Sequence, residues 1–163
     1  MTNSEPKPNC LCGSEIEYSL CCEPFHNKLS NPLTAEALMR SRFTAYASKN
    51  ESYLLETWRG SKRPEAIDFS KEEAIWTHLD IVKTKKGLKK DNKGIVEFKA
   101  YYTLENEPYV MTEISRFVKK ADHWLYLDGV VKFVAKANQQ SNQGKNAPCS
   151  CGSGKKFKRC CGK

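Results

Sequence analysis

The sequence predicts an α+β fold: helices packed on a curved antiparallel sheet, with a small cysteine module at each end of the chain. Three observations predict it. Apolar residues recur at helical spacing after residue 34, apolar and polar residues alternate after residue 76, and all eight cysteines lie in the two end segments. Helices that precede a run of antiparallel strands are typical of α+β domains.

The eight cysteines form two sets with the same spacing, C-x-C-x8-C-C. They are Cys10, Cys12, Cys21 and Cys22 in the N-terminal set and Cys149, Cys151, Cys160 and Cys161 in the C-terminal set. In both sets Gly-Ser follows the second cysteine directly. A shared register of this kind indicates an internal repeat of one small module.

Each set can supply four thiolates to one metal ion. Two sulfurs beside a tight glycine turn and a vicinal pair eight residues later can complete a tetrahedral site, which suits zinc in a structural role. A module of about 15 residues buries too little apolar surface to fold alone, so bound metal must supply most of its folding free energy. We therefore expect two structural zinc ions, one in each set.

Other interpretations of the cysteines stay open at this stage. Disulfides are typical of secreted proteins, and the polar segment Met1 to Asn9 does not look like a secretory signal. Iron–sulfur clusters usually have other spacings, and a catalytic thiol needs a histidine partner and one distinct cysteine. One cysteine of each vicinal pair can also be a bystander, and His26 is a further candidate ligand.

The net charge of +8 is concentrated at the C-terminal end. Residues 137–163 carry six basic residues and no acidic residue, whereas residues 1–31 carry four acids and two bases. A basic segment favours an acidic protein surface, an anionic lipid or nucleic acid as partner, and a solubilising tail is the plainer interpretation. Because no apolar run reaches the roughly 18 residues that span a bilayer, we expect a cytoplasmic protein rather than an integral membrane protein.

The helices are predicted at the start of the central region. Thr34 is a suitable cap for a helix that ends before Lys49. Its apolar face follows helical spacing through Ala35, Leu38, Met39, Phe43 and Tyr46. A second, shorter helix is predicted over Glu51–Arg59, and the capping-box pattern of Ser70 with Glu73 predicts one more helical turn.

Four strands are predicted after the helices, as an antiparallel meander over residues 77–85, 95–104, 109–119 and 124–134. The lysine-rich stretch between the first two, with its glycines, is typical of a hairpin loop. The predicted organisation is an N-terminal module over 1–31, an α+β domain over 32–136, a linker over 137–147 rich in Asn, Gln, Ser and Gly, and a C-terminal module over 148–163.

Arg42 is the unusual residue of the first predicted helix, because it interrupts the apolar face. A charge there needs a partner, and Glu113 on a predicted strand can pair with it. We favour this structural interpretation, since paired interior charges are common without catalysis. The functional interpretation is a small pocket with the candidate residues Arg42, Tyr46, Trp58, Tyr102, Glu113 and Trp124. No motif identifies a catalytic residue.

The C-terminal set resembles the SEC-C motif, the zinc-binding tail best known from the SecA translocation ATPase. Residues 148–162, which read PCSCGSGKKFKRCCG, carry this resemblance. The N-terminal set keeps the cysteines and Gly-Ser, but has Glu15, Ile16 and Glu17 where the motif usually has glycine and lysines. The resemblance implies zinc ligation for all eight cysteines. It implies a basic partner-binding face only for the C-terminal set, at Lys155, Lys156, Lys158 and Arg159.

The middle of the chain resembles the YchJ family of bacterial proteins, in which SEC-C motifs flank a nuclear-transport-factor-2-like domain. The resemblance rests on Leu38–Tyr46, Thr57-Trp58, Ser115–Phe117 and Trp124–Gly129. It implies a cone of helices on a curved sheet and brings no settled activity.

From the basic zinc module we expect a non-enzymatic adaptor that docks on an acidic protein partner, for example a chaperone or a translocation component. Two alternatives use other features of the sequence. One is an enzyme or small-ligand receptor that uses the pocket of the central cone. The other is a nucleic-acid-binding protein, for which a basic module of this size predicts weak and salt-sensitive binding.

Overall fold

The computed structural model describes residues 5, 7–137 and 151–161. The predicted linker beyond residue 137 and the predicted ligand Cys149 lie outside these residues. Among the described residues, short helices and two longer ones precede four strands, and a single helical turn follows near the C-terminal end.

Two capped helices form the helical layer, as the sequence predicts, although the second ends three residues before the predicted Arg59. Helix α2 spans Ala35–Ala47, and the Thr34 hydroxyl accepts a hydrogen bond from the Ala37 amide at 3.0 Å. Helix α3 spans Glu51–Glu56, and the Asn50 side chain accepts one from the Tyr53 amide at 3.1 Å. Each cap satisfies one of the amides that the first turn of a helix leaves without a partner.

The predicted antiparallel meander is confirmed. Its strands are β1 (Ile75–Lys86), β2 (Lys93–Leu104), β3 (Glu107–Lys120) and β4 (His123–Lys136), paired in the order β1-β2-β3-β4. The β2–β3 connection has positive φ at Glu105 and Asn106, and the β3–β4 connection has it at Ala121 and Asp122. Two consecutive left-handed residues are the signature of the tight turns whose twist matches that of the strands.

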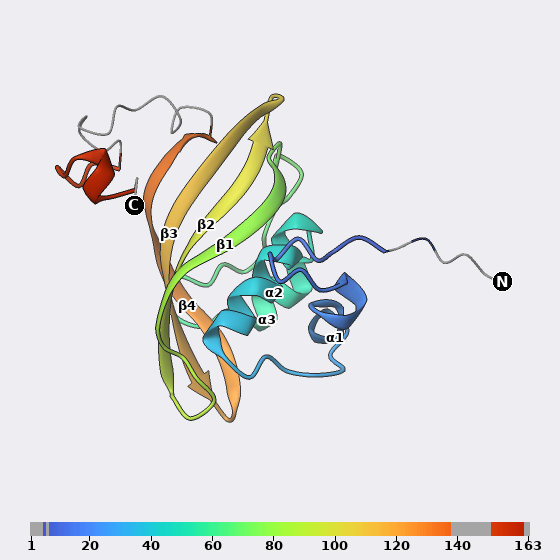
Figure 1. Cartoon of the computed structure of the whole chain (residues 1–163). Coiled ribbons are helices and arrows are strands. Elements are labelled where there is room, and N and C mark those ends of the chain that lie inside the picture. The colour runs from blue at the N-terminus through green and yellow to red at the C-terminus, as the bar shows by residue number, and fades with distance from the viewer. Residues whose placement is uncertain (1–4, 6, 138–150, 162–163) are drawn as a thin grey trace.

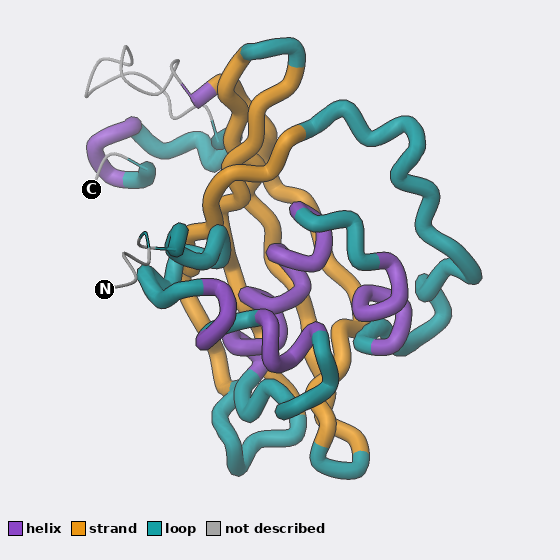
Figure 2. The backbone as a smooth tube through the Cα atoms, turned by 90° about the vertical axis from the view of Figure 1, so that its right-hand side faces the viewer, coloured by secondary structure: helices purple, strands orange, loops and turns teal. Residues whose placement is uncertain are grey.

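The sheet is strongly curved and the helices cover one of its faces (Figure 1). Shifts in the pairing register occur twice between β1 and β2 and twice between β3 and β4. Bulges of this kind bend a strand and increase its twist. Figure 2, seen from the helical side, shows the helices in front of the strands. The predicted α+β cone is therefore the observed architecture.

The main hydrophobic core lies between α2 and the concave face of the sheet. Leu38 and Phe43 of α2 pack there, and every second residue of β2 from Val96 to Ala100 faces them. This period of two follows from the alternation of side chains along a strand. The core positions the side chains of α2 and β3 that line the cavity described below.

The helical turn predicted from Ser70 and Glu73 is wrong. Residues 70–71 form only a turn before β1 begins. The amide of Ser70 donates to the Asp68 carboxylate at 2.9 Å instead, and the amide of Ala74 donates to the Glu72 carboxylate at 3.1 Å. Side chains that bond the backbone locally compete with helix formation, and they prevail here.

The N-terminal cysteine set folds into two short helical segments beside α2 (Figure 1). They are a 3-10 turn over Tyr18–Leu20 and helix α1 over Glu23–His26, where Pro24 suits the first turn. The equivalent 3-10 turn of the C-terminal set spans Phe157–Arg159. No helix among the described residues has the length and apolar character needed to cross a membrane.

Candidate metal centres and the central cavity

The four N-terminal cysteines converge on one point. The sulfurs of Cys10, Cys12, Cys21 and Cys22 all lie within 4.8 Å of one another, and none is in a disulfide. The Cys12 and Cys21 sulfurs are 3.5 Å apart, and those of Cys21 and Cys22 are 3.8 Å apart. A tetrahedral site with metal–sulfur bonds of about 2.3 Å requires sulfurs about 3.8 Å apart. The cluster therefore fits a four-sulfur metal site.

A short hairpin positions the first two sulfurs. The amide of Cys10 donates to the Ile16 carbonyl at 2.7 Å, and this bond closes the loop over residues 10–16 that contains Cys12. Gly13 turns this loop with a φ of +81°. The hydroxyl of Ser14 lies 3.1 Å from the Cys21 sulfur and accepts the Ile16 amide at 3.2 Å. The Gly-Ser pair therefore makes the turn and connects it to the second pair of cysteines.

Hydrogen bonds among the thiols of this set shift their pKa values in opposite directions. Hydrogen bonds from Cys10 and Cys22 lower the pKa of the Cys12 thiol. Donating to Cys12 raises the pKa of Cys10 to about 12, and hydrogen bonds to Cys10 and Cys12 raise that of Cys22. A divalent ion that replaced these protons would turn each donor into a thiolate ligand. Because three of the four cysteines are buried, such an ion would be shielded from solvent.

The described part of the C-terminal set has the same arrangement of sulfurs and serine, with separations that agree within about 0.2 Å. The Cys151 and Cys160 sulfurs are 3.3 Å apart, those of Cys160 and Cys161 are 3.8 Å apart, and Ser153 lies 3.3 Å from the Cys160 sulfur. Gly152 makes the turn with a φ of +76°. Cys149 lies outside the described residues. Three of the four predicted ligands are therefore grouped as in the first set.

Among the contacts that dock the N-terminal module on the α+β domain, three involve Arg40, Gly13 and His26. Arg40 of α2 pairs with Glu36 and donates from Nη1 to the Cys12 carbonyl at 2.5 Å. The Gly13 backbone lies so close to β1 that a Cβ there would be 2.1 Å from the Leu79 carbonyl oxygen. The third contact is made by His26.

His26 connects the module to α2 and is not grouped with the sulfurs. Its Nε2 lies 2.8 Å from the Ser41 carbonyl, which can only accept, so this nitrogen carries the proton. Its Nδ1 then accepts from the Tyr18 hydroxyl at 2.7 Å. Burial lowers the pKa of the imidazole and so favours this neutral form. The alternative in which His26 ligates the metal is therefore wrong, because both ring nitrogens have other partners.

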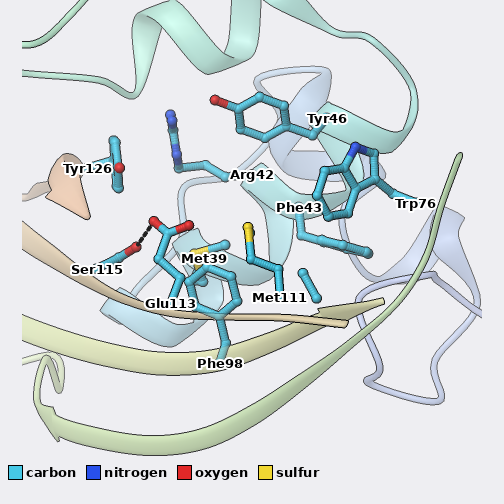
Figure 3. A pocket seen from close by; sticks show the side chains of 11 residues that line it. Met39, Arg42, Phe43, Tyr46, Trp76, Phe98, Met111, Glu113, Ser115 and Tyr126 are labelled. Atoms are coloured by element: carbon cyan, nitrogen blue, oxygen red, sulfur yellow. Dashed lines mark hydrogen bonds between the residues drawn. The ribbon is translucent and has the colours of Figure 1, made fainter. Parts of the chain in front are cut away.

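A cavity of about 250 Å³ lies between α2 and the sheet. Its wall includes three residues of the predicted pocket: Arg42, Tyr46 and Glu113 (Figure 3). The other three lie elsewhere. Trp58 packs its ring 5.1 Å from that of Tyr126, Tyr102 stacks on Tyr109, and the Trp124 indole donates to the Leu33 carbonyl in the core.

The predicted ion pair between Arg42 and Glu113 is wrong. Arg42 donates from Nη1 to the Leu54 carbonyl at 2.8 Å and to the Thr57 hydroxyl at 2.6 Å. Its guanidinium carbon lies 4.4 Å from the centre of the Tyr126 ring. Glu113 accepts instead from the Ser115 hydroxyl at 3.0 Å. The end of α3 therefore provides the hydrogen-bond partners of Arg42, in place of the Glu113 carboxylate that the sequence analysis expected.

Several residues that line the cavity were not among the predicted pocket residues. Met111 and Ser115 lie two positions before and after Glu113, so the period of two along β3 could have identified them. Trp76 pairs with Tyr102 across β1 and β2 and lines the cavity in its place. The two rings lie on the same face of the sheet, with centres 4.8 Å apart, and the sequence does not show which of them lies nearer the cavity.

Comparisons with known proteins identify both parts of the chain. Residues 34–129 match the family model described as the YchJ middle NTF2-like domain, and residues 146–163 match the SEC-C motif. A UPF0225 protein of Vibrio vulnificus is 41% identical over 165 residues, covering 94% of this chain and 98% of the relative. A UPF0225 protein of Serratia proteamaculans is 41% identical over 160 residues, covering 94% and 97%.

Two solved structures share the fold. The solution structure of a SEC-C motif containing protein from Rhodopseudomonas palustris has a TM-score of 0.67 at 31% identity, covering 76% of this chain and 98% of that one. The crystal structure of a SEC-C motif containing protein from Psychrobacter arcticus has a TM-score of 0.62 at 29% identity, covering 99% and 98%. The chain therefore belongs to the YchJ family of UPF0225 proteins, with an NTF2-like middle domain and a SEC-C motif.

Proposed function

We propose that the protein is a zinc-containing adaptor, whose C-terminal module docks on an acidic surface of a partner protein. The observation that carries the proposal is the difference between two modules of one geometry. Three of the four cysteines of the first are buried, whereas Cys151 and Cys160 of the second are half-buried, and Cys161 is exposed, as are residues 154–156, 158 and 159. A module that is held by metal but not used in the core is available for binding.

The exposed rim of the C-terminal module is strongly basic. Lys155, Lys156 and Arg159 border a shallow hollow, with Gly154 at its edge, and Lys158 belongs to the same helical turn. At the equivalent positions the N-terminal module has Ile16, Glu17, Ser19 and Leu20. Four cations on a metal-held loop attract an acidic surface without the conformational entropy loss that a disordered tail incurs on binding.

Zinc is the metal that suits both sets. Four thiolates in a closed tetrahedral arrangement favour zinc among the common divalent ions and leave no coordination position for a substrate. The proposal is therefore two structural zinc ions per chain. Metal analysis of the purified protein is expected to give two zinc per chain in the wild type and one in each of the variants Cys12→Ser and Cys151→Ser. A wild-type protein without stoichiometric zinc would reject this part.

The docking is tested by charge reversal. Partners that co-purify with the full chain are compared with those of a variant in which Lys155, Lys156, Lys158 and Arg159 are changed to Glu. A matched control changes four exposed lysines of the domain to Glu: Lys83, Lys85, Lys89 and Lys90. We expect the rim variant, and a chain that ends at residue 147, to lose a partner that the control variant keeps.

Three outcomes would contradict the proposal. If the rim variant retained every partner of the wild type, the module would not be the docking site. If the captured material disappeared after nuclease treatment, nucleic acid would be the partner, and binding should then fall steeply with salt. If the rim were required only for retention on vesicles of anionic lipid, a membrane surface would replace the acidic protein.

A further inference from the structure

The central cavity has an apolar end and a polar end (Figure 3). Phe43, Met111 and Trp76 lie together at one end. Arg42, Glu113 and Tyr126 lie together at the other. Small-molecule sites in proteins have this composition, with a mostly apolar wall and a few polar groups that fix the orientation of the ligand. Nothing in the adaptor function described above requires it.

Arg42 brings a positive charge into this cavity without a carboxylate in contact. The residue is 2% exposed, so its charge is shielded from solvent. Its partners include the Leu54 carbonyl, the Thr57 and Tyr46 hydroxyls and the rings of Tyr126 and Trp58, and all of these are uncharged at neutral pH. Burial lowers the pKa of Arg42 to about 10, which still leaves the guanidinium protonated at neutral pH. A buried cation of this kind is stabilised by a bound anion.

Glu113 is present but is held away from Arg42. Its carboxylate accepts from Ser115 of its own strand and rests on the backbone of Gly129 in β4. A Cβ at Gly129 would lie 2.1 Å from the Oε1 atom of Glu113. The other groups that act on this carboxylate are Arg42 and, through their hydroxyls, Tyr46 and Tyr126. Burial raises the pKa of Glu113, while the Ser115 hydrogen bond and the charge of Arg42 act in the opposite direction.

We propose that the cavity binds a small organic acid, with the carboxylate of the ligand against Arg42 and its apolar body against Met39, Phe43 and Met111. The size of the cavity sets the size of the ligand. An apolar cavity of about 150 Å³ accommodates benzene. The cavity of about 250 Å³ therefore holds one ring, or a short aliphatic chain, together with a carboxylate.

Three probes of one size and shape test the charge of the ligand: benzoate, benzamide and benzylamine. Each is titrated into the zinc-loaded full chain at neutral pH, and binding is followed by chemical-shift changes at the amides of Met111, Glu113 and Ser115. We expect benzoate to bind at least about tenfold more tightly than benzamide, since charge-assisted hydrogen bonds are roughly twice as strong as neutral ones. Benzylamine should not bind.

Two variants and one control assign the roles. Arg42→Met should abolish benzoate binding, whereas Glu113→Gln should keep it or strengthen it, because the amide keeps the shape and removes the competing negative charge. Arg116→Met is the matched control. It removes an arginine that pairs with Asp128 and does not line the cavity, so benzoate should bind as in the wild type.

Each other result would overturn the proposal. Tighter binding of benzylamine or benzamide than of benzoate would mean that Glu113 recognises the ligand. Loss of benzoate binding in Glu113→Gln would lead to the same conclusion. Absence of binding for all three probes at millimolar concentration would mean that the cavity is only a packing defect. Should Arg42→Met fail to fold, the probe series and the Glu113→Gln variant still decide, because neither removes the bonds that Arg42 makes to α3.

Discussion

The two cysteine modules have one local geometry and two different surroundings. The sulfur separations and the serine contact agree between them to a few tenths of an ångström. In the N-terminal module, Gly13 touches β1 and Tyr18 reaches His26. In the C-terminal module, nothing described lies within 4 Å of a Cβ at Gly152 or Gly154. The same cysteine pattern therefore packs against the domain in one place and forms an exposed surface in the other.

The residues between the cysteines account for this difference. Tyr18 provides a hydroxyl that bonds His26, whereas Phe157 occupies the same position of the C-terminal module and has none. Ile16 and Leu20 are exposed, as are Lys155 and Arg159 at the equivalent positions of the C-terminal module, so these positions differ in charge and not in burial. Conserved cysteine geometry thus fixes the module, and the intervening side chains fix where it can be placed.

Removing one ligand from each module is expected to give the largest contrast. Cys12→Ser should lower the unfolding free energy of the α+β domain by about 4 kcal/mol or more, because it disrupts a buried metal site that packs on α2 and β1. Cys151→Ser should change it by less than about 0.5 kcal/mol. Urea unfolding followed by tryptophan fluorescence measures both. Equal destabilisation by the two variants would show that the C-terminal module also belongs to the core.

Adding one methyl group at the turn of each module sharpens the comparison. Gly13 and Gly152 both have left-handed φ, so alanine costs each about 1–2 kcal/mol of backbone strain. Only at Gly13 does the new Cβ also collide with a backbone oxygen of β1. We expect Gly13→Ala to lower the stability of the domain by about 2–3 kcal/mol, and Gly152→Ala to leave it unchanged while weakening zinc binding by the C-terminal module.

Thermal or urea unfolding measures the first effect, and competition with a chromophoric zinc chelator measures the second. A similar loss of domain stability in both variants would contradict the docking contact. So would a Gly13→Ala variant that unfolds with the same midpoint as the wild type.

Exchanging the aromatic residues of the two modules tests the third contact. Tyr18→Phe leaves the Nδ1 atom of His26 without its donor, and should lower the stability of the domain by about 1 kcal/mol. Phe157→Tyr adds a hydroxyl at the equivalent position and should leave stability within about 0.5 kcal/mol. Unfolding midpoints at one protein concentration give both numbers. A neutral Tyr18→Phe substitution would mean that solvent replaces the lost hydroxyl.

The pH dependence of His26 is the smallest expected effect. Burial lowers its folded-state pKa below the ordinary value of about 6.5, so the unfolded chain takes up the proton first. The stability that neutral His26 contributes is then fully present above about pH 6.5, and is lost as the pH falls through the folded-state pKa. A proton NMR titration of the imidazole in the zinc-loaded protein measures this pKa directly. A value at or above 6.5 would contradict the hydrogen bonds assigned to the ring.

Much of the fold could be predicted because its signals are local. Thr34 and Leu38 mark α2 through a cap and a helical period, and the alternation from Val96 to Ala100 marks β2. The partner of Arg42 could not be predicted in this way. Sequence shows that an arginine on an apolar face needs a partner, but several partners satisfy it equally. The Leu54 carbonyl at the end of α3 gives no sequence signal as an acceptor, because every residue has a carbonyl.

The sequence by itself determined the two cysteine sets, the order of helices and strands, and the basic character of the last module, because spacing and charge are properties of neighbouring residues. Only the tertiary structure decided that the first module packs against β1, that His26 bonds α2, and that Trp76 rather than Tyr102 lines the cavity. Those choices depend on how far the sheet bends and which surfaces meet. The physical reason is that these contacts join residues far apart in the sequence. Local sequence patterns therefore do not predict which surfaces pack together.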